Sequence, residues 1–260
     1  MPRFSANLTL LWPELEQYDR FAAAAAAGFR RVEILFLYAL DQAWVRRLLD
    51  EHGLELVLFD PEPGNWSAGE RGLLAVPGRE DEFRRSLEAA IDTAQQLNVS
   101  RLNALAGLLP DGVSRAQAEA TALSNLRAAA PLMEAAGLTL LVESINSIDW
   151  PGYSLDTIEL AARLVEEAAS PAVRLQLDQY HVGMMGGDAR EALARYAPLV
   201  AHVQIADIPG RHQPGTGQQP IAAFLDDLDR LGYAGSVGLE YRPEGPTEDA
   251  LAWLPRDRRG

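Results

Sequence analysis

Four apolar segments in the second half of the chain each end in a side chain that can bind a metal ion through oxygen. The segments read LTLLVE, VRLQLD, VAHVQ and SVGLE, and their last residues are Glu143, Asp178, Gln204 and Glu240. Each segment is typical of a strand buried on both faces, and burial gives such a strand no reason to end on a carboxylate or an amide. The intervals between these residues are each close to one strand–helix unit. The pattern therefore predicts a hard-cation site at one end of a parallel barrel.

The chemistry of this ligand set favours proton transfer beside a carbonyl group. Carboxylate and amide oxygens suit Mg²⁺ or Mn²⁺ better than zinc or copper. Such an ion acts as a Lewis acid on an α-hydroxy-carbonyl compound and lowers the pKa of the C–H next to the carbonyl. Glu143 and Glu240 end different strands, so one can remove a proton and the other return it. The alternative, in which each acid only caps a helix or lies in solvent, is weaker for four residues than for one.

The four histidines have different predicted roles. His181 follows Asp178 by three residues, so it could form a hydrogen bond with a substrate hydroxyl or bind the ion. His202 lies two residues before Gln204 on the same strand and is expected inside the barrel or behind the ligands. His52 is expected to cap a helix, and His212 has no assignment.

Two long connections follow predicted strands and are therefore expected at the carboxyl end of the barrel, where barrel enzymes have their active sites. They span residues 60–79 and 207–220. In the second, Arg211 and the PGTG at 214–217 could cradle a phosphate or carboxylate, although a plain turn is the simpler interpretation.

The loop at residues 60–79 carries a second candidate substrate patch. Arg71 lies in the GERG sequence close to Trp66, and arginine pairs bidentately with carboxylates. A surface role for Arg71 stays open.

Strand-like and helix-like segments alternate along the whole chain, which predicts a single-domain α/β fold, a (β/α)₈ TIM barrel over residues 1–260. Glycines 28, 53, 137 and 232 follow helix patterns as stops, and Ser114 and Ser154 suit helix N-caps. Strands are expected to begin near Phe4, Val32, Leu54, Arg101, Leu138, Val173, Val200 and Ser236. Helices are expected at 15–27, 42–51, 80–97, 114–136, 155–168, 189–196 and 221–231.

The composition excludes several classes of chemistry. The 260 residues include no cysteine, so disulfides, thiol nucleophiles and iron–sulfur clusters are excluded. All 23 basic residues are arginine, so Schiff-base lysine enzymes and pyridoxal phosphate enzymes are excluded too. The net charge of −14 opposes binding to nucleic acid. No apolar stretch reaches the ~20 residues of a membrane span, and the start lacks a secretory layout, so a cytoplasmic protein is expected.

The chain resembles the hydroxypyruvate isomerase family, within the xylose-isomerase-like barrel superfamily. The resemblance extends almost end to end. It rests on RFSANL, GFRRVEILF, NWSAGERG, VPGRE, VESIN, LDQYH, HVQIAD, PGTG and VGLEYRP, which begin at residues 3, 28, 65, 76, 142, 177, 202, 214 and 237. The combination of GERG, PGRE and a glutamine in the third ligand place is more specific than the superfamily pattern.

This resemblance implies reversible isomerisation of hydroxypyruvate and 2-hydroxy-3-oxopropanoate, a small keto acid substrate, with a divalent metal ion and no organic cofactor. It implies that Glu143 and Glu240 are the acid/base pair and also bind the ion. Asp178 and Gln204 would complete the ion's ligands. His181 and Arg211 fall where related ketose epimerases contact substrate hydroxyls.

Several alternatives stay open beside this interpretation. The loop at 208–218 departs from the family pattern at Ile208, Gly210, Gln213 and Gln218, so 2-oxotetronate isomerisation is an alternative activity. A ketose 3-epimerase is disfavoured by Gln204, because epimerases usually have histidine there. A non-catalytic sugar-acid binder and an abasic-site endonuclease are weaker alternatives. No nucleic-acid or membrane partner is expected, and association into homo-oligomers stays open.

Overall fold

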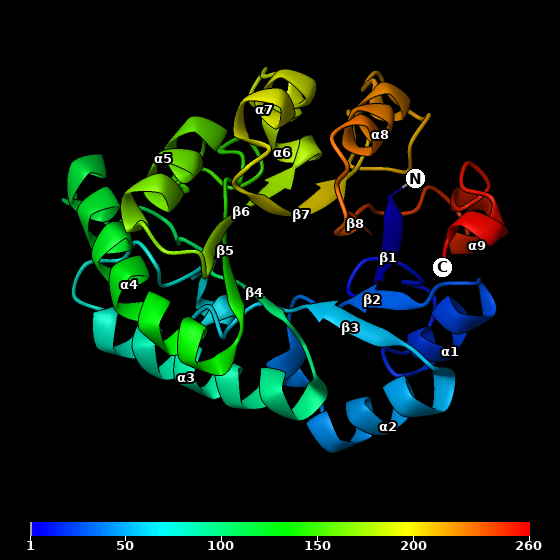
Figure 1. Ribbon diagram of the computed structural model, residues 1–260, viewed down its shortest axis with the longest axis horizontal. Coiled ribbons are helices and arrows are strands. Elements are labelled where there is room, and N and C mark those ends of the chain that lie inside the picture. Colours follow the sequence, from blue (N-terminus) through cyan, green and yellow to red (C-terminus); the bar gives the residue numbers. More distant parts are fainter. Residues whose placement is uncertain (1) are drawn as a thin grey trace.

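The computed structural model describes residues 2–260 as eight parallel strands surrounded by helices (Figure 1). The expected starts of all eight strands are confirmed to within one residue. The strands are β1 (Arg3–Asn7), β2 (Arg31–Glu33), β3 (Glu55–Leu58), β4 (Arg101–Asn103), β5 (Thr139–Glu143), β6 (Val173–Asp178), β7 (Val200–Ile205) and β8 (Ser236–Leu239).

The sheet closes almost completely into a barrel. Its strand order is β3-β2-β1-β8-β7-β6-β5-β4, so the two ends of the sheet are β3 and β4. A single parallel bridge between Phe59 and Leu102 connects these ends, with the Asn103 amide donating to the Phe59 carbonyl at 3.1 Å. The predicted TIM barrel is therefore confirmed, and its only incomplete seam among residues 2–260 lies between β3 and β4.

Helices pack around the barrel because each presents an apolar stripe to the sheet. The expected helices are all present, and two short ones, α6 and α9, were not predicted. The α-helices are α1 (Asp19–Ala26), α2 (Gln42–His52), α3 (Glu80–Leu97), α4 (Arg115–Ala136), α5 (Ile158–Ala168), α6 (Gln179–Met184), α7 (Ala189–Tyr196), α8 (Ile221–Arg230) and α9 (Thr247–Ala250). Short 3₁₀ helices lie at Leu37–Ala39, Trp66–Ala68 and Arg256–Arg258.

Several helix ends follow the expected sequence signals, and one predicted cap does not form. Ser114 forms a capping box with Gln117, as expected, and Gly53 and Gly137 end α2 and α4 in the left-handed conformation. The predicted N-cap at Ser154 is wrong. Thr157 caps α5, because the Ser154 hydroxyl instead donates to the Gly107 carbonyl at 2.7 Å.

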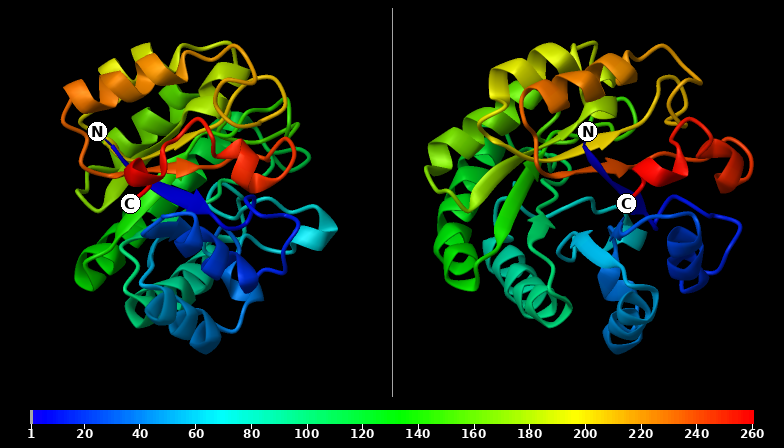
Figure 2. Two further views of the ribbon diagram at one scale, coloured as in Figure 1. Left: turned by 90° about the vertical axis from the view of Figure 1, so that its right-hand side faces the viewer. Right: turned by 45° about the vertical axis from the view of Figure 1, so that its right-hand side comes forward.

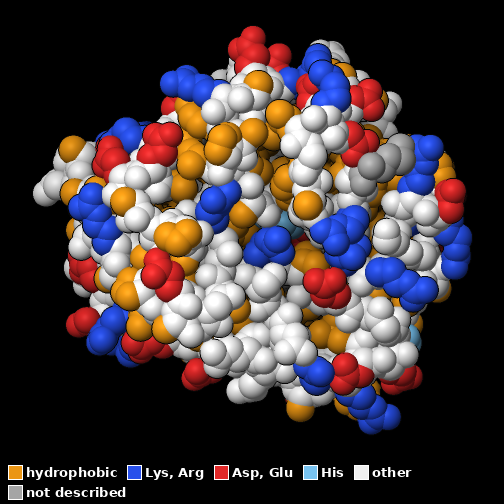
Figure 3. All heavy atoms as spheres, in the orientation of Figure 1, with side chains coloured by type: hydrophobic (Ala, Val, Ile, Leu, Met, Phe, Trp, Pro, Cys, Tyr) orange, Lys and Arg blue, Asp and Glu red, His pale blue; other side chains and the backbone are white. Residues whose placement is uncertain are grey.

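The strands run from the side of the barrel where the N-terminus lies toward the side that carries the long loops (Figure 2). Figure 3 shows the N-terminal side, where basic side chains gather near the centre of the face. Arg101 and Arg174 of β4 and β6 donate there to the carbonyls of Ala201 and Leu199, each at 3.1 Å. Arginine side chains thus donate hydrogen bonds to backbone carbonyls at this end of the barrel.

Among residues 2–260, no helix is long and apolar enough to cross a membrane.

Candidate active site

A buried side chain that can accept or donate hydrogen bonds lies at the end of every strand of the barrel or within two residues of it. Each of these eight residues is at most 5% exposed. They lie at the carboxyl ends of the strands, the side on which TIM-barrel enzymes carry their active sites. In chain order they are Asn7, Glu33, Asp60, Asn103, Glu143, Asp178, Gln204 and Glu240.

The sequence predicted only the last four of these residues. The first four end RFSAN, RVE, ELVLFD and RLN, so the same signal was present. It was missed because β2 and β4 have only three residues each, too few to form a recognisable apolar run. Asn103 matters directly, since its Nδ2 donates to Glu143 Oε2 at 2.8 Å.

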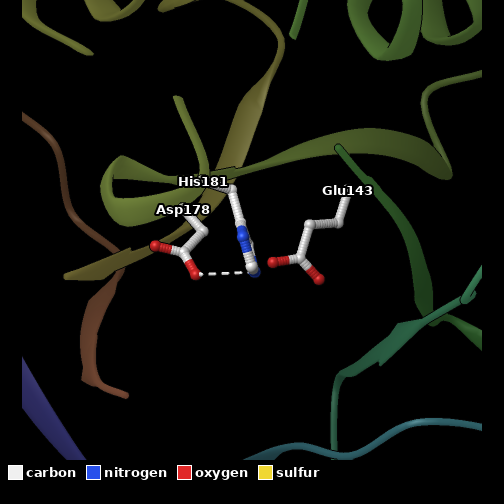
Figure 4. A group of neighbouring side chains, drawn as sticks. All are labelled: Glu143, Asp178 and His181. Atoms are coloured by element: carbon white, nitrogen blue, oxygen red, sulfur yellow. Dashed lines mark ion pairs between the residues drawn. The ribbon is translucent and has the colours of Figure 1, made fainter. Parts of the chain in front are cut away.

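Glu143, Asp178 and His181 form a compact buried group (Figure 4). One ligand atom from each lies within 4.8 Å of the others, so the group could hold a metal ion. Figure 4 shows the imidazole between the two carboxylates, and His181 Nε2 lies 3.4 Å from Asp178 Oδ2. Burial, and after it the Arg211 charge, hold the pKa of His181 well below its usual value, so its ring is neutral at pH 7.

Arg211 connects Asp178 to Glu240. Its guanidinium donates to Glu240 Oε1 at 2.6 Å and to Asp178 Oδ2 at 3.2 Å. It also lies over the ring of Tyr180, 5.0 Å from the ring centroid. The structure therefore brings Arg211 to the two predicted metal ligands, as the position of its loop suggested.

The charges of this site favour a bound cation. Burial raises the pKa of Glu143 well above its usual value, and repulsion from Glu240, Asp178 and Asp60 raises it further. Burial likewise raises the pKa of Glu240 to about 8, although Arg211 opposes the shift. Three buried carboxylates, those of Glu143, Asp178 and Glu240, thus lie near one guanidinium, that of Arg211. A divalent ion would offset this excess negative charge, and the oxygen-rich donor set suits Mg²⁺ or Mn²⁺ chemically.

Gln204 is buried and lies opposite Asp178 in the pairing of β6 with β7. Its side chain forms hydrogen bonds with Gln176 and Glu33. Its Oε1 accepts from Gln176 Nε2 at 2.6 Å, and its Nε2 donates to Glu33 Oε2 at 3.0 Å. An amide oxygen has a second lone pair, so this network leaves Oε1 able to bind an ion. His202 Nε2 lies 2.9 Å from Glu33 Oε1, inside the barrel as expected.

Asp207, just after β7, organises the loop that carries Arg211. Its carboxylate accepts from the backbone amides of Ile208, Gly215, Gly217 and Gln219 at 2.9–3.0 Å. Gly217 is required there, because a Cβ would lie 2.1 Å from the Ile208 carbonyl oxygen. The amides of the PGTG sequence are thus used inside the protein, and the interpretation of this sequence as a phosphate cradle is wrong.

Replacing Asp207 with alanine is expected to loosen this loop and displace Arg211. Four backbone donors would lose a charged acceptor, which costs about 3 kcal/mol or more of local stability. We expect faster trypsin cleavage after Arg211 and lower kcat, measured by limited proteolysis and steady-state kinetics. Asp92→Ala, at an exposed position of α3, is the control. Wild-type cleavage in the Asp207 variant would contradict this role.

Arg71 and Trp66 lie in an aromatic cluster on the loop after β3. The Arg71 guanidinium lies 4.1 Å from the Trp66 ring centroid and 5.8 Å from that of Trp150. One guanidinium nitrogen, Nη1, donates to the Trp66 carbonyl at 3.1 Å and to the Glu70 carbonyl at 2.7 Å. Stacking and two carbonyl bonds hold the guanidinium in place, so the pair is preorganised rather than a loose surface arginine.

Comparison with known proteins agrees with this architecture. The model of the xylose isomerase-like TIM barrel family matches residues 21–256. A solved structure described as an AP endonuclease of family 2 from Brucella melitensis has 41% sequence identity, a TM-score of 0.95 and 98% coverage of both chains. The chain therefore belongs to the xylose isomerase-like TIM barrel family.

Within that family its similarity is to two groups of curated isomerases. The chain is 42% identical over 254 residues to 2-oxo-tetronate isomerase of Cupriavidus necator, covering 98% of both chains. It is 39% identical over 254 residues to hydroxypyruvate isomerase of Escherichia coli, again covering 98% of both. The family resemblance seen in the sequence motifs is confirmed.

Proposed function

We propose that this protein isomerises hydroxypyruvate and 2-hydroxy-3-oxopropanoate reversibly. The observation that carries the proposal is the pair of buried glutamates at the ends of β5 and β8. Glu143 lies beside Asp178, and Arg211 donates hydrogen bonds to both Asp178 and Glu240. The full-length similarity to isomerases of short keto acids supports the same chemistry.

The reaction needs two proton transfers on carbon and one between oxygens. A base removes a proton from C3 of hydroxypyruvate to give an enediolate, and an acid returns a proton to C2. The hydroxyl proton moves from O3 to O2, so the atoms balance. We assign the two carbon transfers to Glu143 and Glu240, which come from separate strands. Both carboxyls are buried, so each can exchange a proton with the substrate out of contact with bulk water.

Glu143, Asp178, Gln204 and Glu240 are proposed to hold Mg²⁺ or Mn²⁺. The ion would polarise the substrate carbonyl and so acidify the neighbouring C–H. Arg211 and His181 are proposed to contact substrate oxygens, because both reach Asp178 from within the same buried site. No organic cofactor enters this scheme.

Arg71, stacked on Trp66, is the proposed anchor for the substrate carboxylate. Replacing Arg71 with methionine is expected to raise KM by about 10–100-fold, since a charged hydrogen-bonded pair contributes about 1.5–3 kcal/mol. Arg71→Lys should recover only part of the loss, because lysine lacks the planar fork. Arg84→Met on α3, whose side chain is 59% exposed, is the control. An unchanged KM in the Arg71 variants would remove this assignment.

Turnover on a panel of hydroxypyruvate, 2-oxotetronates and free ketoses tests the proposed substrate. We expect the highest kcat/KM with hydroxypyruvate. Preference for a 2-oxotetronate would favour the second candidate, which the identity to the Cupriavidus enzyme supports equally well. Activity on ketoses alone would favour an epimerase, and no activity on short keto acids would overturn the proposal.

Action on DNA fits this chain less well than action on a small acid. The net charge of −14 opposes approach to a phosphate backbone.

A cytoplasmic location and the pairing of barrels into oligomers stay predictions.

A further inference from the structure

Asn146 is a buried residue of the loop after β5 whose side chain has a fixed orientation. It is 0% exposed. Its Oδ1 accepts from the backbone amides of Asp149 at 2.7 Å and Ile148 at 3.1 Å. Backbone amides can only donate, so the carboxamide cannot be turned over without breaking both bonds. Its Nδ2 must therefore face the opposite way.

Two donors of Asn146 meet a single nitrogen of His181. Asn146 Nδ2 lies 2.7 Å from His181 Nδ1, and the backbone nitrogen of Asn146 lies 3.4 Å from the same atom. Neither donor can accept, so Nδ1 must present its lone pair. If Nδ1 were protonated, as in the other tautomer or in imidazolium, its N–H would point at the N–H groups of Asn146, and two donors would repel each other. The ring proton therefore belongs on Nε2.

The surroundings of Nε2 agree with this assignment. Nε2 lies 3.4 Å from Asp178 Oδ2, and the ring stands between the carboxylates of Asp178 and Glu143 (Figure 4). Carboxylates accept hydrogen bonds, which matches an N–H at Nε2. A histidine that binds a metal has the reverse arrangement, in which its second nitrogen donates to an acceptor. His181 meets donors at that position.

We propose that Asn146 fixes His181 as the Nε2–H tautomer, which makes His181 a hydrogen-bond donor to the substrate and not a ligand of the ion. Asn146 is then a positioning residue. The donation to substrate rests on the proposed function, whereas the tautomer does not.

The same loop also steadies the arginine side of the site. The second hydrogen of Asn146 Nδ2 goes to Asp149 Oδ2 at 3.0 Å, and that oxygen also accepts from the Tyr180 hydroxyl at 2.8 Å. The Tyr180 ring in turn lies under the Arg211 guanidinium. One hydrogen-bonded network, partly buried, thus holds both groups that are proposed to contact the substrate.

The test exchanges an amide and a carboxylate of the same shape. In the double variant Asn146→Asp/Asp149→Asn, an acceptor replaces the donor opposite His181 Nδ1 while the net charge is unchanged. Asp149→Asn alone is the matched control, because its amide oxygen can occupy the place of Asp149 Oδ2. Nitrogen-15 NMR of histidine-labelled protein distinguishes a protonated ring nitrogen from a bare one.

We expect Nε2–H in the wild type and in Asp149→Asn, and a proton on Nδ1 in the double variant. The double variant should also lose at least about tenfold in kcat, the value of one hydrogen bond of about 1.4 kcal/mol. A wild-type ring with its proton on Nδ1, or an unchanged tautomer in the double variant, would overturn the inference. The wild-type spectrum decides the point even if the double variant does not fold.

Ion binding gives a second and independent measurement. His181→Ala should retain its affinity for Mn²⁺, measured by calorimetry without substrate. If His181 were a ligand, its loss would remove a bond to the ion and lower the affinity by more than the roughly 10–100-fold that is typical of losing a partner behind a ligand, which would also contradict the inference. The tautomer and the proposed reaction can fail separately. If NMR shows Nε2–H in His181 but the protein turns over no keto acid, the tautomer is supported and the proposed reaction is overturned.

Discussion

Glutamine in place of Glu143 or Glu240 is expected to lower kcat by about 10²–10⁴-fold, the usual contribution of a general acid or base. The substitution keeps the shape of the side chain but removes its ability to take and return a proton. Both residues are 5% exposed, so no nearby water can replace them easily. Steady-state turnover of the best keto acid of the panel measures the effect.

Solvent deuterium exchange separates the two glutamates. A variant that retains the base for one substrate should still exchange that substrate's C–H with D₂O, although it completes no isomerisation. We expect Glu143→Gln and Glu240→Gln to retain exchange in opposite directions of the reaction. Glu55→Gln, at the far end of β3 with a side chain 57% exposed, is the matched control. Wild-type turnover in either active-site variant would disprove the acid/base assignment.

The barrel could be predicted from sequence because strands buried on both faces are continuous apolar runs. LTLLVE and VRLQLD are such runs, and β5 and β6 begin within one residue of the predicted positions. The helix α6 could not be predicted in the same way. It has six residues and begins directly after Asp178, which ends β6 and also caps the helix by accepting from the Tyr180 amide. A strand end and a helix start share one residue there, which leaves no turn signal between them.

The site was less predictable than the barrel, because tertiary contacts decide how each polar group is used. Ser154 has the sequence of an N-cap but bonds to Gly107, and the glycine amides of PGTG bond to Asp207. Asn146 lies in VESIN three residues after the predicted ligand Glu143, yet only the fold shows that two backbone amides fix its orientation. Residue types can thus predict the chemistry of this site, whereas hydrogen-bond partners determine the role of each residue.

Removal of divalent ions is expected to abolish turnover, and the effect of the ion on stability should depend on pH. In the ion-free protein the pKa of Glu240 is raised from 4.5 to about 8, chiefly by burial. A group with a raised pKa contributes stability below its unfolded pKa, and this contribution is lost as the pH rises through its folded pKa. The ion-free protein should therefore become less stable between about pH 5 and pH 8 on account of this group. A bound ion replaces the proton, so its stabilising effect should increase over the same range.

Calorimetry at several pH values, after dialysis against a chelator and with Mg²⁺ or Mn²⁺ restored, measures this effect. We expect the rise in Tm caused by the ion to be larger near pH 8 than near pH 5, and ion binding near pH 7 to release protons. Glu143 and Asp178 should add to the same trend, because the pKa of each is raised in the ion-free protein, mainly by burial. Full turnover after chelation would contradict the proposed requirement for a divalent ion. A pH-independent change in Tm would place the ion away from Glu240, since only a carboxylate that exchanges its proton for the ion links the two equilibria.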